Sequence, residues 1–245
     1  MFNAVRLGPR RMVWRSSLLE DCGTPHLFTT RDLNARSADD LVDLVATARW
    51  FGANDPPARI VLSKQVHGCA VDTPGSRLAE ADAHVTDEPW EVVAVRTADC
   101  VPVLLSTADG KLVAALHAGW RGLDPAVGVL GRAVAAMLSR GSVSGVGELS
   151  AAVGPCISVP NYEVGEEVAS RFRDRYPDAL RDDLGDKPHL DTRAVAVAQL
   201  REAGVAAERI DVFPGCTYED AEAFFSFRRE GKGVGHLAAL ITPRQ

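Results

Sequence analysis

Two apolar runs joined by Asp109-Gly110 constrain the fold of this chain most strongly. The runs are VPVLLS (101–106) and KLVAALHA (111–118), and both are rich in the β-branched and aliphatic residues of buried strands. Because Asp-Gly favours a tight reversal between strands, the pattern predicts an antiparallel hairpin. Pairing about this turn sets Leu105 and Ser106 opposite residues near 113.

Further strand-like and helix-like segments surround this hairpin. We expect strands at 59–66, 92–97, 149–154, 208–213 and 235–241, and helices at 125–140, 164–176 and 191–204. This order predicts an α/β protein with a mixed rather than a purely parallel sheet. We find no repeat and no long linker, so we expect one domain over residues 1–245. The glycine-rich EGKGVG (230–235) leads into a strand, which predicts a turn and not a phosphate-binding loop.

The charge balance argues against one broad class of partner. The chain has 27 Lys and Arg against 33 Asp and Glu, and no basic stripe that would release counterions from a nucleic-acid backbone. We therefore expect a small-molecule partner and no nucleic acid. No apolar run reaches the length of a membrane span, and no signal-peptide core follows the N-terminal arginines. We expect a cytoplasmic protein without membrane contact.

The N-terminus and the cysteines bear on targeting and redox state. Residues 1–19 carry four Arg and no acidic residue, as a mitochondrial transit segment would. Their helical periodicity is poor, so a first strand or a ragged terminus is the simpler interpretation. The five cysteines are scattered and form no C-x-x-C pair. This spacing argues against a disulfide framework and against a ribbon-type zinc site.

Three short motifs place reactive side chains at strand ends. KQVHG contains His67, TADC contains Cys100, and HAGWRG contains His117. The far ends of the predicted hairpin bring Cys100 close to His117 and Ala118. A Cys beside a His is either a nucleophile with its base or a pair of metal ligands, and a second His favours the metal. Three such ligands with an open position are typical of catalytic zinc, and copper accepts the same donors. The spacing alone leaves both interpretations open.

Asp99 interrupts the apolar pattern directly before Cys100. An acid beside a ligand can orient an imidazole or accept a proton, which makes Asp99 a candidate catalytic residue. Strand alternation would point residues 99 and 100 to opposite faces unless the backbone bends there. The sequence therefore leaves the role of Asp99 open.

Several motifs together resemble one known family. They are KQVHG, TADCVPVLL, AALHAGWRG, AAVGPCI, YEVG and FFSFRREG followed by AALI, from about residue 59 to the C-terminus. In this order and spacing the chain resembles the YfiH-type laccase-domain family, also called the multicopper polyphenol oxidase or purine nucleoside phosphorylase family. The resemblance implies a mixed-sheet α/β sandwich related to toxin cysteine deamidases. It also implies a zinc ion held by His67, Cys100 and His117.

The resemblance further implies an activity on purine nucleosides. Adenosine would be deaminated to inosine, and adenosine, inosine or 5′-methylthioadenosine would be cleaved by phosphate, with Cys100, His117 and Asp99 at the centre of the chemistry. Phosphorolysis needs a cation near the phosphate and a donor to the departing base. The cations nearest the motifs are Lys64, Arg121 and Arg228. Gln65 and Asp82 are candidates for hydrogen bonds to ribose or base. We expect a monomer that binds nucleoside and phosphate.

The chain departs from the family pattern at two places. The N-terminal part keeps Thr30-Arg31 but lacks the Gly-Gly and Ser-Leu-Asn-Leu stretch usual for the family, which affects one side of the expected pocket. Near the C-terminus, Gly235-His236 stands where the family usually has Gly-Arg. Any anion contact of that arginine would be altered here.

Three rival functions remain. A copper polyphenol oxidase is disfavoured, because a multicopper centre needs about ten His and the chain has six. A metal-free cysteine hydrolase would use Cys100 and His117 as nucleophile and base, with His67 as a bystander. The third is a factor that keeps incorrect amino acids out of peptidoglycan precursors, as some bacterial relatives are thought to do.

Overall fold

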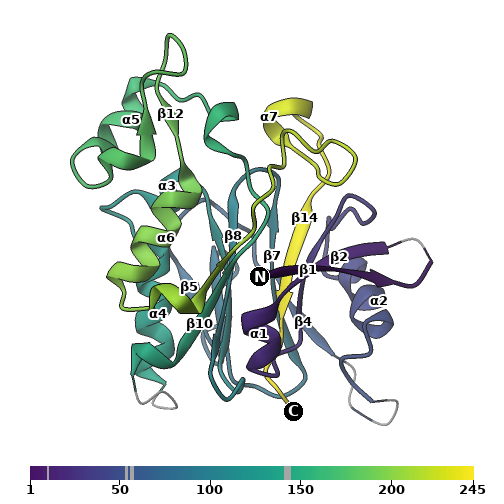
Figure 1. Cartoon of the computed structure of the whole chain (residues 1–245). Coiled ribbons are helices and arrows are strands. Elements are labelled where there is room, and N and C mark those ends of the chain that lie inside the picture. Colours follow the sequence, from purple (N-terminus) through teal and green to yellow (C-terminus); the bar gives the residue numbers. More distant parts are fainter. Residues whose placement is uncertain (10, 53–54, 56–57, 141–144) are drawn as a thin grey trace.

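The computed structural model describes residues 1–9, 11–52, 55, 58–140 and 145–245. Over these residues the chain forms two six-stranded sheets (Figure 1) and one short two-stranded ribbon. In the order of pairing, the first sheet contains β1 (Phe2–Leu7), β2 (Arg11–Ser16), β3 (His26–Thr29), β14 (Leu237–Ile241), β7 (Glu91–Thr97) and β4 (Arg59–Val61). The second contains β13 (Ile210–Val212), β10 (Leu149–Val153), β8 (Val101–Thr107), β9 (Val113–Ala118), β6 (Ala83–Thr86) and β5 (Val71–Asp72). The ribbon pairs β11 (Leu180–Arg181) with β12 (His189–Leu190).

Both sheets combine parallel and antiparallel pairs, as predicted. In the first sheet β4 runs parallel to β7, whereas β14 is antiparallel to both of its neighbours. In the second sheet β10 runs parallel to β13 and β5 parallel to β6, while β8 and β9 form an antiparallel hairpin. The mixed-sheet α/β prediction is confirmed.

Helices cover the outer face of each sheet, giving a layer order of helix, sheet, sheet, helix (Figure 1). Among the longer helices, α2 packs on the first sheet, and α4 and α6 pack on the second. The helices are α1 (Ser17–Asp21), α2 (Asp39–Thr47), α3 (Trp120–Leu123), α4 (Val129–Ser139), α5 (Glu166–Arg173), α6 (Thr192–Glu202) and α7 (Phe227–Glu230). No helix within the described residues is both long and apolar enough to span a membrane.

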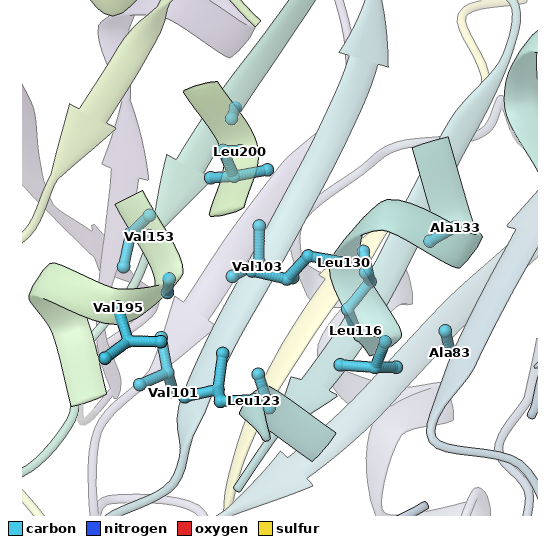
Figure 2. Close-up of a cluster of buried hydrophobic side chains, with 14 of the residues drawn as sticks. Ala83, Val101, Val103, Leu116, Leu123, Leu130, Ala133, Val153, Val195 and Leu200 are labelled. Atoms are coloured by element: carbon cyan, nitrogen blue, oxygen red, sulfur yellow. The ribbon is translucent and has the colours of Figure 1, made fainter. Parts of the chain in front are cut away.

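The largest apolar cluster lies between the second sheet and its helices (Figure 2). Val103 and Leu116 of the central hairpin face Leu130 of α4 and Val195 of α6, and all four side chains are buried. Burying each such side chain contributes about 1.5–3 kcal/mol to stability. The hairpin that carries two of the reactive motifs is therefore held on its outer face by the main core.

The other face of the same hairpin packs against the first sheet. Leu104 of β8 and Ala115 of β9 share this second cluster with Val93 of β7. Because side chains alternate along a strand, His117 faces the same side as Ala115. The reactive end of the hairpin therefore opens between the two sheets.

The hairpin register agrees with the sequence prediction. Ser106 pairs with Val113, and Pro102, two residues beyond Cys100, pairs with His117. Gly110 has φ of +72° in the turn, a backbone conformation that glycine adopts without steric cost. The predicted approach of Cys100 to His117 follows directly from this register.

Several predicted boundaries change in the structure. The helix expected over 125–140 starts only at Val129, because Gly128 has φ of +63° and breaks the helical path before it. The strand expected over 59–66 ends at Val61, and the remaining residues form the loop that carries His67. Within the N-terminal segment, Phe2–Leu7 forms β1, Arg11–Ser16 forms β2 and α1 begins at Ser17, in agreement with a first strand. The predicted turn at 230–235 is present, with positive φ at Gly231 and Gly233.

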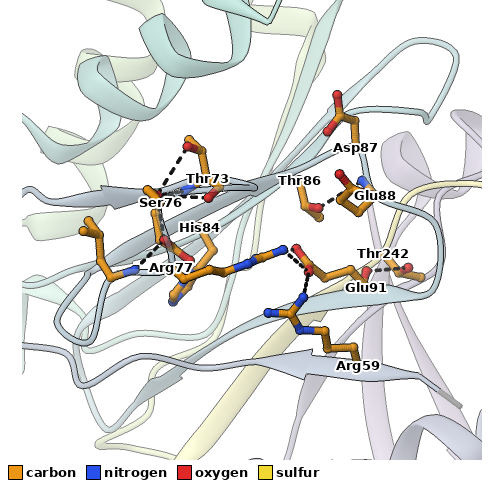
Figure 3. Close-up of polar contacts among 12 residues, drawn as sticks. Arg59, Thr73, Ser76, Arg77, His84, Thr86, Asp87, Glu88, Glu91 and Thr242 are labelled. Atoms are coloured by element: carbon orange, nitrogen blue, oxygen red, sulfur yellow. Dashed lines mark hydrogen bonds and ion pairs between the residues drawn. The ribbon is translucent and has the colours of Figure 1, made fainter.

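The buried residue Glu91 links three segments at the edge of the first sheet (Figure 3). The Glu91 carboxylate forms ion pairs with Arg77 at 2.8 Å and Arg59 at 3.5 Å. Its backbone carbonyl accepts a hydrogen bond from Thr242 Oγ1 at 2.9 Å. These contacts link β4, β7 and the segment after β14, away from the reactive motifs.

Candidate functional site

His67, Cys100 and His117 meet at one end of the two sheets. Each offers one donor atom, and the three donor atoms lie within 4.8 Å of one another. The His67 and His117 rings are 4.7 Å apart between centroids and meet edge to face at 80°. The structure thus gathers the three residues that the sequence singled out from separate motifs.

A left-handed backbone turns His67 toward the other two residues. His67 has φ of +59°, a conformation that non-glycine residues rarely adopt. The adjacent Gln65 fastens this loop to β7, since its side-chain amide donates to the Arg96 carbonyl and accepts from the Arg96 N–H, both at 2.7 Å. Gln65 lines the pocket, but both ends of its amide are occupied by the backbone.

The Asp82 carboxylate lies behind the three donors and is fully buried. It accepts a hydrogen bond from His117 Nδ1 at 2.8 Å, so Nε2 is the ring nitrogen left for the site. It also accepts backbone N–H groups from Val66 (3.1 Å), His67 (2.9 Å) and Gly68 (2.8 Å). The prediction that Asp82 contacts ribose or base is therefore wrong, because a buried carboxylate with these partners is closed to a ligand.

The Cys100 and His117 side chains stabilise each other's charged form. Burial opposes ionisation of Cys100, but His117 and His67 outweigh it and lower the pKa of the thiol to about 6. Burial likewise disfavours a charged His117, yet Cys100 and Asp82 raise the pKa of its imidazole to about 9. Without a metal, the two groups form a thiolate–imidazolium pair.

The local backbone leaves room for an ion beside these donors. A Cβ atom at Gly119 would lie 2.8 Å from His67 Cδ2 and 3.1 Å from Cys100 Sγ, so only glycine fits there without displacing them. A thiolate with two imidazoles is a donor set that zinc and copper both accept. The three residues therefore fit a metal ion.

A pocket of about 480 Å³ opens above the three donors. This volume is typical of sites for small molecules of nucleoside size. Its walls come from both sheets and from the loops around α3 and α7, and include Gln65, His67, Arg96, Asp99, Cys100, His117, Trp120, Arg121, Tyr162, Phe227, Arg228 and His236.

Asp99 reaches this pocket, but its carboxylate is occupied. It accepts hydrogen bonds from Thr217 Oγ1 at 2.6 Å, Ser226 Oγ at 3.0 Å and the Arg228 N–H at 2.7 Å. Its φ of +92° provides the backbone bend that the sequence analysis required between residues 99 and 100. The acid thereby joins the Cys100 strand to the first turn of α7.

Two of the three predicted cations line the pocket. The Arg121 guanidinium lies 4.5 Å from the Trp120 ring centroid, and that of Arg228 lies 5.1 Å from the Tyr162 ring centroid. Arg228 Nη2 also donates to the Glu163 carbonyl at 2.9 Å. Lys64, in contrast, is exposed and forms an ion pair with Glu80 at 2.7 Å. The structure does not bring Lys64 into the pocket.

Three ionisable pocket residues were not among the candidates predicted from the sequence. Tyr162 stood in the quoted YEVG motif without an assigned role, and burial together with the charge of Cys100 raises the pKa of its phenol. Arg96 was hidden in a strand-like run, and His236 was noted only as a departure from the family. The alternation of apolar and polar residues at Arg96 was the available signal that its side chain leaves the core.

The chain is similar in sequence to proteins named for an enzyme activity and in fold to a solved structure. A protein of Mycobacterium tuberculosis strain H37Rv named purine nucleoside phosphorylase is 39% identical over 220 residues, which cover 87% of this chain and 85% of that protein. A prokaryotic protein named adenosine deaminase RL5 is 34% identical over 192 residues, covering 72% of each chain. The crystal structure of YlmD from Geobacillus stearothermophilus superposes with a TM-score of 0.83 at 24% identity and covers 99% of each chain, which shows the fold.

Fold and site together define a two-sheet α/β protein with a His/Cys/His donor set between its sheets. The family model described as multi-copper polyphenol oxidoreductase laccase matches residues 24–244. The chain belongs to this family. The family implies a metal, and the donor set formed by His67, Cys100 and His117 is a site where this chain could hold one.

Proposed function

We propose that the chain is a zinc-dependent purine nucleoside enzyme. It would cleave adenosine, inosine or 5′-methylthioadenosine with phosphate, and it would deaminate adenosine. The observation that carries the proposal is the pocket, which sets the metal-donor group beside arginines that form no ion pair with any described residue. The names of the relatives at 39% and 34% identity support the same two reactions.

The arginines favour an anionic co-substrate. Within the described residues, no Asp or Glu oxygen lies within 4 Å of the guanidinium of Arg96, Arg121 or Arg228, although the chain as a whole has a net charge of −6. Stacking on Trp120 and Tyr162 holds the planes of two of these groups and leaves N–H donors for a ligand. We assign Arg121 and Arg228 to phosphate.

Tyr162 and Asp99 have separate roles in the proposed phosphorolysis. In phosphorolysis, a phosphate oxygen bonds to C1′ of the sugar while the bond from C1′ to the base breaks. Tyr162 keeps its proton because its pKa is raised, so its hydroxyl can donate a hydrogen bond to the departing base. Asp99 positions the backbone of Arg228.

The zinc would be held by His67, Cys100 and His117, with Asp82 fixing the His117 ring. When bound there, zinc would supply a Lewis acid that lowers the pKa of a water molecule, which is the chemistry that deamination at C6 of adenine requires.

One observation favours a second candidate. The lowered pKa of Cys100 and the raised pKa of His117 describe an activated nucleophile with its acid partner, as a metal-free cysteine hydrolase would need. In that enzyme His67 would have no direct role. Metal content separates the two candidates.

The test combines metal analysis with product analysis. The protein is purified without a histidine tag, its metals are measured by mass spectrometry, and adenosine is supplied with and without phosphate. We expect about one zinc per chain, inosine in both reactions, and adenine with ribose 1-phosphate only when phosphate is present. Cys100→Ser should lose zinc and both activities.

Cys69→Ser is the matched control, because Cys69 is half-buried and does not line the pocket. It should keep zinc and activity. A metal-free protein with full turnover would favour the cysteine hydrolase, and zinc retained in Cys100→Ser would refute the proposed ligand set.

A further inference from the structure

The pocket also contains two basic residues that the phosphate assignment does not use, Arg96 and His236. Arg96 lies in β7, and His236 directly precedes β14, its neighbour in the first sheet. Arg121, in contrast, belongs to α3, which follows β9 of the second sheet. We call Arg96 and His236 the basic corner.

Hydrogen bonds fix the backbone of both residues. The Gln65 side chain accepts a hydrogen bond from the Arg96 N–H and donates one to the Arg96 carbonyl. The His236 N–H donates to Asn34 Oδ1 at 2.9 Å, and its carbonyl accepts from the Ala35 N–H at 2.9 Å. The basic corner is therefore built on two anchored segments rather than on free loop ends.

The side chains of the basic corner have unused donor capacity. Arg96 Nη1 donates to the Arg36 carbonyl, but Arg96 Nε is buried without a hydrogen-bond partner in the described structure. No hydrogen bond of the His236 imidazole is found among the described residues. Arg96 Nη2 also has no acceptor among the described residues and is not enclosed, so it and the His236 imidazole are the N–H donors that the corner offers to an anion in the pocket.

The charges around the corner are unbalanced. Burial and the nearby Arg96 and Arg36 lower the pKa of His236, which shows that its neighbours are cationic. The Asp40 carboxylate accepts the backbone N–H groups of Arg36 and Ser37, and it forms no ion pair with a guanidinium of the described chain. Arg96 likewise forms no ion pair with an acid of the described residues, so an anionic ligand would meet an uncompensated positive charge.

We infer that Arg96 and His236 form a subsite for a phosphoryl group, separate from the phosphate position assigned to Arg121 and Arg228. The inference rests on the proposed function, because it adds a second phosphoryl position to the same pocket. The phosphoryl group can come from inorganic phosphate or from the 5′-phosphate ester of a purine nucleotide. Guanidinium and imidazole N–H groups bind either one in the same way.

Binding is measured by calorimetry on the metal-loaded protein, with inorganic phosphate and adenosine 5′-monophosphate as separate probes. Arg96→Gln should weaken at least one probe by about tenfold or more, the loss expected for a charge-assisted hydrogen bond. His236→Arg should tighten binding of that same probe, since it adds a permanent charge. Arg132→Gln, an exposed change in α4 outside the pocket, should leave both affinities unchanged.

The two probes identify the source of the phosphoryl group. An effect on phosphate alone assigns the subsite to the co-substrate, and an effect on the nucleotide alone assigns it to a phosphorylated substrate. The subsite would be overturned if the parent, Arg96→Gln and His236→Arg bound each probe with the same affinity as one another. It would also be overturned if the parent bound neither probe. Zinc content and adenosine turnover, measured on the same samples, test the proposed function independently of this result.

Discussion

The carboxylate of Asp82 holds His117 through its ring and His67 through its backbone. It lies 2.8 Å from His117 Nδ1 and 2.9 Å from the His67 nitrogen. One buried acid therefore sets the ring orientation of one metal-donor residue and the unusual φ of another. Such outer partners of a metal-ligating histidine fix its tautomer and raise its basicity.

Asp82→Asn should weaken zinc binding by about 10–100-fold, because an amide keeps the shape of the carboxylate but presents N–H groups to donors. Competition with a chromogenic chelator measures the affinity. Asp87→Asn, which removes a partly exposed ion pair with Arg140, is the control and should bind zinc like the parent. An unchanged affinity in a folded Asp82→Asn protein would contradict the positioning role.

Gly119→Ala should abolish tight metal binding while the fold persists. The Gly119 backbone, with φ of −74° and ψ of 169°, suits any residue, so the added methyl acts only through its contacts with His67 and Cys100. Zinc content and circular dichroism measure the two effects. Gly131→Ala is the matched control, because its Cβ meets no atom within 4 Å and it lies inside α4. That control should bind zinc fully and unfold at a slightly higher temperature.

Asp99→Ala should lower the free energy of unfolding by about 2–3 kcal/mol, since it leaves two buried hydroxyls and the part-buried Arg228 N–H without their acceptor. Asp99→Asn should cost less, because the Thr217 hydroxyl can reverse and accept while Asn tolerates the positive φ. Urea denaturation measures both. Equal losses in the two variants would show that the hydrogen bonds of Asp99 do not stabilise this junction.

His26 should make the protein less stable in mild acid. Its Nε2 accepts the Ser16 N–H at 2.8 Å, and its Nδ1 donates to the Thr24 carbonyl at 2.8 Å, so the folded state requires a neutral ring. Burial lowers the pKa of His26 to about 4 from an ordinary value of 6.5. Between these values the unfolded chain takes up a proton that the folded chain does not. Stability should therefore fall as the pH falls from 6.5 to 4, with a slope of up to about 1.4 kcal/mol per pH unit from this group.

His26→Gln isolates this contribution, because Gln can accept the same N–H but does not titrate. The difference in unfolding free energy between parent and variant should be constant above pH 7 and should narrow as the pH falls. Chemical denaturation at a series of pH values provides the curve. Parallel curves from pH 7 to 4 would show that His26 is protonated equally in both states.

The central hairpin and the approach of Cys100 to His117 could be predicted from the sequence because both depend on local rules. An Asp-Gly turn and alternating apolar residues determine the register, and the register alone brings Cys100 to His117. The approach of His67 depended on the positive φ of a non-glycine residue, which has no sequence signature.

The positions of Asp82 and Lys64 and the N-terminal strands could not be predicted from the sequence, because they depend on long-range contacts. Asp82 looks like a loop acid in ADAHVTD, and only the folded chain shows that it is enclosed by 66–68 and His117. Lys64 lies three residues from His67, yet its side chain turns outward to Glu80. The strands β1 to β3 lack a strong apolar period, and they gain order from packing with β14 and β7.

The position of β14 has a consequence for biosynthesis. This strand lies between β3 and β7, antiparallel to both, although the ribosome adds it after all the other strands of either sheet. The first sheet is thus two separate halves until translation of residues 237–241 is finished. We expect nascent chains halted before Leu237 to be cut readily by protease in both halves, and the phosphoryl-binding corner beside β14 to form only after release of this strand from the ribosome.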